Sequence, residues 1–190
     1  MKDLNFDRSG IASFVKNTVA KESITAVEVG VFRGHFTNRY YDHLGNSSLY
    51  LVDLWETSDH DGYISGIAPG DVEVGYQEVL NNYGSKPNVK ICKGFSSEWA
   101  NKFEDEYFDW IYLDADHSKK AVLQDLQLWY PKLKKGGAIS GHDFLPNPHE
   151  ITHYFGVDEA VKEFFAHDIE NIHLTCEQYY KSWVYFKPTE

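Results

Sequence analysis

The chain has 190 residues, of which 42% are hydrophobic and 16% aromatic, and its formal net charge is −11 at pH 7. This length suits one domain with a substantial apolar core, so we expect residues 1–190 to form a single domain. The negative charge disfavours nucleic acid as a partner, because neutralising phosphates requires clustered lysine and arginine side chains.

The cysteines and the apolar segments of the sequence indicate the compartment in which the protein is expected. The two cysteines, Cys92 and Cys176, belong to no Cys-x-x-Cys or Cys/His cluster. This pattern disfavours a disulfide framework and a structural zinc site, and it is typical of a reducing compartment. The first residues lack the apolar core of a secretion signal, and no apolar run reaches the length of a membrane span, about 18 residues. We therefore expect a cytoplasmic protein that does not contact membranes.

Helical and β-type segments alternate along most of the chain, which indicates βαβ units and a mainly parallel sheet. Residues 1–23 are expected to form a helical N-terminal extension, with a helix over 11–20, and residues 24–187 the core. The expected core strands cover 26–31, 49–54, 89–93, 110–114 and 137–141. The expected core helices cover 37–44, 72–83, 98–103, 119–133 and 157–166.

The carboxyl end of the chain has a different pattern. Two β-type segments, 171–176 and 183–187, are separated by too few residues for a helix. This spacing predicts a close antiparallel pair at the end of the sheet.

The first strand and the turn after it form the strongest local signal, AVEVGVFRGHFT over residues 26–37. Doubly wound sheets bind ligands at the carboxyl ends of their strands, and Gly30 there allows a ligand to approach the backbone. Phe32 and His35 occupy the second and third glycine positions of the dinucleotide fingerprint GxGxxG, which disfavours a diphosphate cofactor. The Glu28 carboxylate would also repel a diphosphate and attract an ammonium or sulfonium group.

Asp53 ends the next strand, LYLVDLW, where a carboxylate can accept hydrogen bonds from both ribose hydroxyls. S-adenosylmethionine carries a ribose, an ammonium and a sulfonium but no phosphate, so Glu28 and Asp53 together favour it. Acids that cap helices or face water are the structural alternative for both residues. Because Asp53 alone would also suit NAD, a nicotinamide-dependent oxidoreductase stays open as an alternative function.

Four segments together resemble a known family: VEVGVFRGHFT, LYLVDLW, KGFSSE and, most specifically, YLDADHSKKAVLQDLQLWYPKLKKGGAISGHDF. They resemble class I methyltransferases of the branch that includes the macrocin-type O-methyltransferases, over roughly residues 24–187. The resemblance implies an α/β, doubly wound, Rossmann-like fold with seven strands in the order 3-2-1-4-5-7-6 and strand 7 antiparallel. It also implies methyl transfer from S-adenosylmethionine to a small-molecule acceptor, most simply at oxygen.

The resemblance further implies cofactor-binding positions at the ends of the first four strands. These are the motif around the methionine part, the acid that binds the ribose, the loop that borders the adenine and the acid beside the methyl group. By this resemblance, Glu28, Gly30 and Gly34 belong to the motif around the methionine part, and Asp53 is the acid that binds the ribose. Gly94, Phe95 and Ser96 form the loop that borders the adenine, and Asp114 is the acid beside the methyl group. Many class I enzymes have a further glycine at the position of Phe32, where this branch accepts a bulky residue.

A metal is one device that could activate a hydroxyl acceptor. Asp114 and Asp143 end strands that are neighbours in the implied sheet, so their carboxylates can share a divalent cation such as Mg²⁺. His142 stands where the macrocin-type enzymes have an acid, and imidazole suits Mn²⁺, Fe²⁺ or Zn²⁺ better than Mg²⁺. Two interpretations stay open: a metal site of Asp114, His142 and Asp143, or a structural role for Asp143 as a loop cap.

A general base is the other device. His117 follows Asp114 and Asp116 in DADHS, and nearby carboxylates raise the pKa of an imidazole that otherwise titrates near neutrality. The same segment also predicts a helix start, with Ser118 or Asp116 as the cap. His117 is therefore either the catalytic base beside Asp114 or a residue that orients structure and substrate.

The acceptor site has no large extra domain to form it. We expect it between the first helix and the loops 55–70 and 144–156, where Trp55, Tyr63 and Phe144 either line the pocket or simply pack. A non-catalytic S-adenosylmethionine-binding module is the remaining alternative. The sequence leaves the oligomeric state open, with a homo-oligomer as one option.

Overall fold

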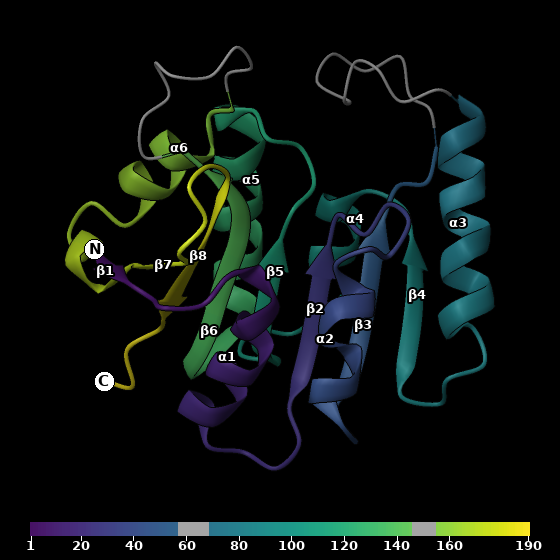
Figure 1. Cartoon of the computed structure of the whole chain (residues 1–190), viewed down its shortest axis with the longest axis horizontal. Helices are drawn as coiled ribbons and strands as arrows, with labels where there is room; N and C mark the ends of the chain where they lie inside the picture. Colours follow the sequence, from purple (N-terminus) through teal and green to yellow (C-terminus); the bar gives the residue numbers. More distant parts are fainter. Residues whose placement is uncertain (57–68, 146–154) are drawn as a thin grey trace.

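The computed structural model describes residues 1–56, 69–145 and 155–190, which contain one sheet with helices on both faces (Figure 1). Its strands are β1 (Lys2–Asp3), β2 (Thr25–Val29), β3 (Ser48–Asp53), β4 (Val89–Lys93), β5 (Phe108–Leu113), β6 (Leu133–Phe144), β7 (His173–Leu174) and β8 (Lys181–Phe186). Its α-helices are α1 (Ile11–Val19), α2 (Thr37–Leu44), α3 (Pro69–Tyr83), α4 (Ser96–Ala100), α5 (Lys119–Trp129) and α6 (Val157–Phe164). None of the described helices is both long and apolar enough to span a membrane.

The sheet has the order β1-β7-β8-β6-β5-β2-β3-β4. The strands from β2 to β6 pair in parallel, whereas β8 is antiparallel to both β6 and β7. Read from β4 to β7, this is the expected order 3-2-1-4-5-7-6 with its antiparallel strand 7. The Rossmann-like fold and the antiparallel pair at the chain end are therefore confirmed.

The sheet has eight strands rather than the expected seven, because β1 adds to the outer edge of β7. This strand lies in the N-terminal extension that was expected to be helical, and α1 follows it in that extension. The backbone N–H groups of Lys2 and Leu4 donate to the carbonyls of Ile172 and Leu174, at 2.8 and 2.7 Å. Two residues are too short to show a periodic pattern, so the sequence carried no signal for this pairing.

The two faces of the sheet bury separate apolar clusters. On one face, α4, α5 and α6 cover inward side chains of the central strands, including Val27 and Ile111. On the other face, α1, α2 and α3 cover Ala26, Trp110 and Tyr112. The side chains of β5 are buried along its whole length, as expected for a central parallel strand with helices on both sides. The sheet is thus a rigid base whose strand ends carry the loops.

Helix α5 is shorter than the expected 119–133 and gives way to a 3₁₀ turn over Tyr130–Lys132. Pro131 lies inside that turn, and its ring removes a backbone donor that a continuing α-helix would need. At the other end, the hydroxyl of Ser118 accepts a hydrogen bond from the Ala121 N–H, so Ser118 is the helix cap. The capping interpretation of DADHS is therefore confirmed for Ser118.

Asp109 of β5 anchors the edge of the sheet opposite the strand ends that carry the long loops. Its buried carboxylate accepts hydrogen bonds from the Thr25 N–H at 2.8 Å, from Lys21 at 2.5 Å and from Lys134 at 3.0 Å. Burial raises the pKa of Asp109, but these donors outweigh burial and hold the pKa below the ordinary carboxyl value of 3.8.

We expect Asp109→Ala to lower the free energy of unfolding by about 2 kcal/mol at neutral pH, because it removes charge-assisted hydrogen bonds from a buried site. A carboxylate whose pKa falls on folding stabilises the folded state above its unfolded pKa and loses this effect as the pH falls through the folded value. The gap between wild type and variant in urea unfolding should therefore be full at pH 7 and shrink below pH 3.8. Asp105→Ala, at an exposed acid paired with Lys132, is the control and should change little. A gap that widens on acidification would contradict this role.

Candidate functional site

Neighbouring strands bring four expected site residues to one edge of the sheet (Figure 1). Asp53 is the last residue of β3, Gly30 follows β2, Asp114 follows β5, and Asp143 lies near the end of β6. The strand β2 pairs with β3 on one side and β5 on the other, and the chain leaves β2 toward β3. The carboxyl end of β2 is therefore a topological switch point, where doubly wound sheets bind their ligands.

Gly30 lies in close contact with the end of β5. Its φ is +89°, and a Cβ placed on it would lie 2.2 Å from the carbonyl oxygen of Asp114. Gly34 also has a positive φ, +74°. Phe32, the position where related enzymes often have glycine, adopts a left-handed φ of 50° as well. The chain therefore keeps the backbone shape that glycine favours at this position, although its residue is bulky.

Asp53 organises this glycine loop in addition to ending its strand. One carboxylate oxygen accepts hydrogen bonds from the N–H groups of Val31 and Phe32, each at 2.8 Å, and the other accepts from the Trp55 N–H at 3.0 Å. Burial raises the pKa of Asp53 although these N–H groups lower it. Asp53 therefore holds the glycine loop instead of capping a helix or facing water, and its contact with a ribose stays a prediction.

Glu28 connects β2 to the first turns of α2. One of its oxygens accepts hydrogen bonds from the Thr37 hydroxyl at 2.7 Å and the Tyr40 hydroxyl at 2.6 Å, and the residue is only 1% exposed. Burial raises the pKa of Glu28 to about 7. Two hydrogen bonds of Glu28 thus connect β2 to α2. A contact between Glu28 and a cofactor stays a prediction.

The loop after β4 adjoins Asp53, as expected for residues that share a ligand. The Gly94 N–H donates to the Asp53 carbonyl at 2.9 Å, and Phe95 is a large apolar side chain left 42% exposed. The Ser96 hydroxyl accepts a hydrogen bond from Trp129 and donates one to Asp125, at 2.8 and 2.5 Å. The adenine-bordering role of this loop stays a prediction.

The Asp114 carboxylate lies beside two basic side chains, Arg8 and His117. An Nη atom of Arg8 forms an ion pair with one of its oxygens, and His117 Nε2 lies 3.5 Å from the other. Burial would raise the pKa of Asp114, but Arg8 and then His117 lower it overall. Arg8 could not be identified from the sequence, because it lies 106 residues from Asp114 in a polar segment without a motif.

His117 lies between two carboxylates. Its Nε2 is 3.1 Å from Asp143 and 3.5 Å from Asp114, and these three residues can direct ligand atoms to within 4.8 Å of one another. Burial lowers the pKa of His117, but the two carboxylates raise it above the ordinary value of 6.5. His142 is placed differently from the expected metal set, since its Nδ1 lies 3.2 Å from the other oxygen of Asp143. Among the residues that the structure describes, the convergent trio contains His117 in place of His142.

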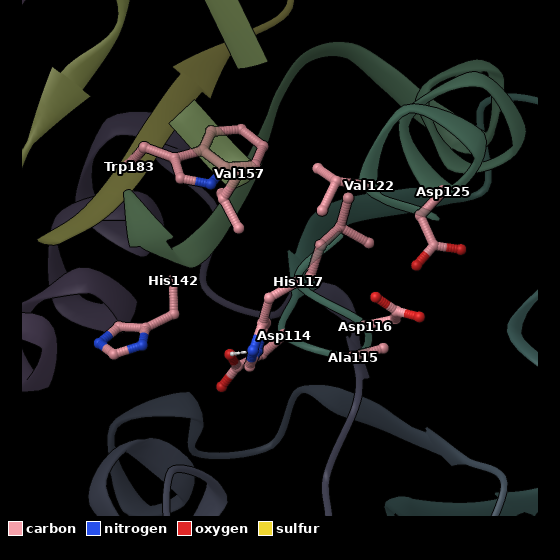
Figure 2. Close-up of a pocket in the computed structure, with 10 residues that line it drawn as sticks. Asp114, Ala115, Asp116, His117, Val122, Asp125, His142, Val157 and Trp183 are labelled. Carbon is pink, nitrogen blue, oxygen red and sulfur yellow. Dashed lines mark ion pairs between the residues drawn. The ribbon is translucent and has the colours of Figure 1, made fainter. Parts of the chain in front are cut away.

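A small pocket surrounds these groups (Figure 2). Its polar wall includes Asp114, His117 and Asp125, while Val157 and Trp183 form part of its apolar wall. Asp125 is a buried acid on α5 that belongs to no motif in the sequence. Burial raises the pKa of Asp125 to about 6. The pocket thus combines a shielded acidic side with an apolar side.

The three aromatic residues considered for an acceptor pocket have different outcomes. Trp55 and Phe144 are 2% and 0% exposed, and both pack in the apolar clusters. Trp55 also donates its indole N–H to the Phe32 carbonyl at 2.7 Å. Packing is therefore the interpretation that the structure supports for these two residues. Tyr63 and most of the expected loops 55–70 and 144–156 lie outside the described residues.

Comparisons with known proteins agree with this geometry. The profile of a family described as a methyltransferase domain matches residues 27–144. The fold resembles a spermidine synthase from Thermotoga maritima (TM-score 0.62, 13% identity), a candidate rRNA methylase from Clostridium thermocellum (0.66, 15%) and the O-methyltransferase NovP (0.63, 15%). These matches cover 96%, 98% and 94% of this chain and 60%, 98% and 79% of the other chains, respectively. The chain thus spans about 60% of the length of the spermidine synthase. No curated protein sequence matches the chain.

We expect Gly30→Ala to destabilise the protein by about 3 kcal/mol or more, because the new methyl group would collide with the Asp114 carbonyl and would require a strained φ. Gly70→Ala is the matched control, since a Cβ at Gly70 would meet no atom within 4 Å. Thermal and urea unfolding of both variants measure the difference. Equal stability of the two variants would contradict the close contact between β2 and β5.

Proposed function

The chain belongs to the methyltransferase-domain family, and from this premise we propose that it transfers the methyl group of S-adenosylmethionine to a hydroxyl of a small-molecule acceptor. The observation that carries the proposal is His117 between Asp114 and Asp143, beside the glycine loop. We place the enzyme with the macrocin-type branch on the residues quoted above. Family membership favours methyl transfer over the nicotinamide alternative, and the net charge of −11 favours a small acceptor over nucleic acid.

Methyl transfer is an in-line displacement in which the acceptor oxygen attacks the methyl carbon, the carbon–sulfur bond breaks and S-adenosylhomocysteine leaves. The sulfonium is already an activated leaving group, so the protein mainly aligns the reactants and excludes water. The strand ends provide a rigid frame for this alignment, and the pocket beside Asp114 is shielded on its apolar side by Val157 and Trp183. The hydroxyl proton still has to move to a base.

His117 is suited to accept that proton. Its Nε2 lies 3.1 and 3.5 Å from the two carboxylates, which favour a proton on Nε2 and leave Nδ1 as the basic nitrogen of the neutral ring. Asp143 and Asp114 then stabilise the imidazolium that forms. In this arrangement Asp114 supports the base and also borders the position expected for the methyl group.

A divalent cation is the second device that the site fits. Two carboxylates and one imidazole nitrogen converge within 4.8 Å, a donor set that suits Mn²⁺, Fe²⁺ or Zn²⁺ better than Mg²⁺. A bound cation would lower the pKa of an acceptor hydroxyl. The two devices compete for His117, because metal binding requires Nε2 without its proton. Activity that is lost in EDTA and restored by Mn²⁺ would favour the metal, and activity unchanged in EDTA would favour the base.

We expect Asp143→Asn to lower the pKa of His117 by about one unit, because it removes a negative charge 3.1 Å from Nε2. The neutral, basic form of His117 dominates above its pKa, so methyl transfer should rise with pH through this value and do so at lower pH in the variant. NMR titration of the imidazole nitrogens measures the shift without an acceptor. His117→Gln, the control, should remove both the signal and the pH-dependent limb. An unchanged His117 titration in Asp143→Asn would contradict the pairing.

We expect Asp53→Ala to weaken binding of S-adenosylhomocysteine about 10- to 100-fold, as charge-assisted hydrogen bonds to the ribose and the order of the glycine loop are lost. Calorimetric titration measures the affinity, and Asp42→Ala, at an exposed acid on α2, controls for the change in net charge. Unchanged affinity would place the ribose elsewhere. A wild-type protein that does not bind S-adenosylhomocysteine would overturn the proposed function. Binding without turnover across a panel of small phenols and alcohols would favour the non-catalytic module.

Whether the enzyme forms a homo-oligomer and whether it acts in the cytoplasm remain predictions from sequence. Size-exclusion chromatography with light scattering would determine the first.

A further inference from the structure

The N-terminal segment holds Arg8 at the strand ends by contacts with the opposite end of the chain. The strand β1 pairs with β7, the Cys176 N–H donates to the Phe6 carbonyl at 3.0 Å, and the Arg8 N–H donates to Glu177 at 2.6 Å. Figure 1 shows this segment crossing from the β1–β7 edge to α1. The backbone of Arg8 is therefore fixed by folded structure on both sides.

The guanidinium of Arg8 lies beside the end of β5, against the rings of Phe36 and Tyr112. It forms the ion pair with Asp114, and its central carbon lies 4.0 Å from the centre of the Phe36 ring and 5.3 Å from that of Tyr112. Its side chain is only 18% exposed. Burial lowers the pKa of Arg8, but Tyr112 and the carboxylates of Asp114 and Glu28 raise it overall, so the guanidinium stays charged. A fixed positive charge thus sits beside the glycine loop.

The hydrogen bonds of this guanidinium are incomplete. Its Nε is buried and has no hydrogen-bond partner, while the ion pair with Asp114 uses an Nη atom. A guanidinium has five N–H donors arranged to bind carboxylates in a bidentate manner, and unpaired buried donors are costly. Arg8 therefore has N–H donors left to bind a second carboxylate while it holds Asp114, after a small change in its side-chain conformation.

The proposed cofactor contains a group that needs such a partner. Its methionine part carries an ammonium and a carboxylate, and the family resemblance places this part against Glu28, Gly30 and Gly34. The acids Glu28 and Asp114 suit the ammonium but repel the carboxylate. Arg33, which lies within the glycine loop, is already bidentate with Glu78. Arg8, by contrast, lies beside Asp114 at the end of β5 and against the Phe36 ring, where the glycine loop meets α2.

We propose that Arg8 binds the α-carboxylate of the methionine part of S-adenosylmethionine, so that the N-terminal segment completes the cofactor site. This inference rests on the proposed function and deepens it. It assigns a binding role to a residue outside the matched residues 27–144. It also explains why an arginine is held against the sheet by contacts to β7 and Glu177.

The test compares two ligands that differ only in the carboxylate: S-adenosylhomocysteine and its decarboxylated analogue, titrated by calorimetry. The wild type should prefer S-adenosylhomocysteine, and Arg8→Gln should bind it about 10- to 100-fold more weakly while binding the analogue as the wild type does. Arg8→Lys should recover part of the loss, because lysine keeps the charge but not the bidentate geometry. Arg39→Gln, at an exposed arginine on α2, is the matched control and should bind both ligands normally.

Three outcomes would overturn the inference. Equal weakening of both ligands by Arg8→Gln would mean that Arg8 supports the fold or Asp114 instead. Equal affinity of the wild type for both ligands would mean that no side chain binds the carboxylate. Unchanged affinity of Arg8→Gln for both ligands, with a raised KM for an acidic acceptor, would assign Arg8 to the acceptor. A wild type that binds neither ligand would instead overturn the proposed function, so the two failures are distinguishable.

Discussion

The contact between Gly30 and the backbone of Asp114 is the constraint on which the site depends. It brings the ends of β2 and β5 so close that no side chain fits between them, and the Asp114 carboxylate is left at the switch point of the sheet. Arg8 and His117 then share this carboxylate from two distant parts of the chain. A larger residue at Gly30 would separate the two strand ends and with them the cation, the imidazole and the glycine loop.

The electrostatics of the site follow from this constraint. The protein as a whole is strongly acidic, yet the Arg8 guanidinium lies against Asp114 and near Glu28 at the strand ends. Arg8 and His117 lie against Asp114, and His117 also lies against Asp143, whereas Glu28 accepts hydrogen bonds from two hydroxyls. Such partners are needed because burial alone would disfavour the charged forms. A ligand that carries both an ammonium and a carboxylate matches such an alternation. A dinucleotide with its diphosphate does not.

The sequence predicted most of the fold because the fold depends on local periodicity. Helix α2 and strand β4 fall on the expected residues, and the order of the strands follows the resemblance. What the sequence did not predict depends on long-range contacts without a pattern. Strand β1 has only two residues and forms because it pairs with β7. Arg8 contacts Asp114 only after the chain has folded, because the two residues lie 106 positions apart. Asp114 and Asp143 were expected to share a metal because their strands are neighbours, and His142 was added because the resembling enzymes have an acid at its position. His117, which the sequence suggested only as a base, also lies against these two carboxylates, because the turn after β5 folds back beside the end of β6.

The most direct measurement of the central claim is a crystal structure of the protein with S-adenosylhomocysteine. We expect the adenosine beside Asp53 and the loop of Gly94, the sulfur beside Asp114 and the methionine carboxylate on the Arg8 guanidinium. A crystal grown at saturating ligand in which this edge of the sheet stays empty, or in which the nucleoside binds elsewhere, would contradict this expectation.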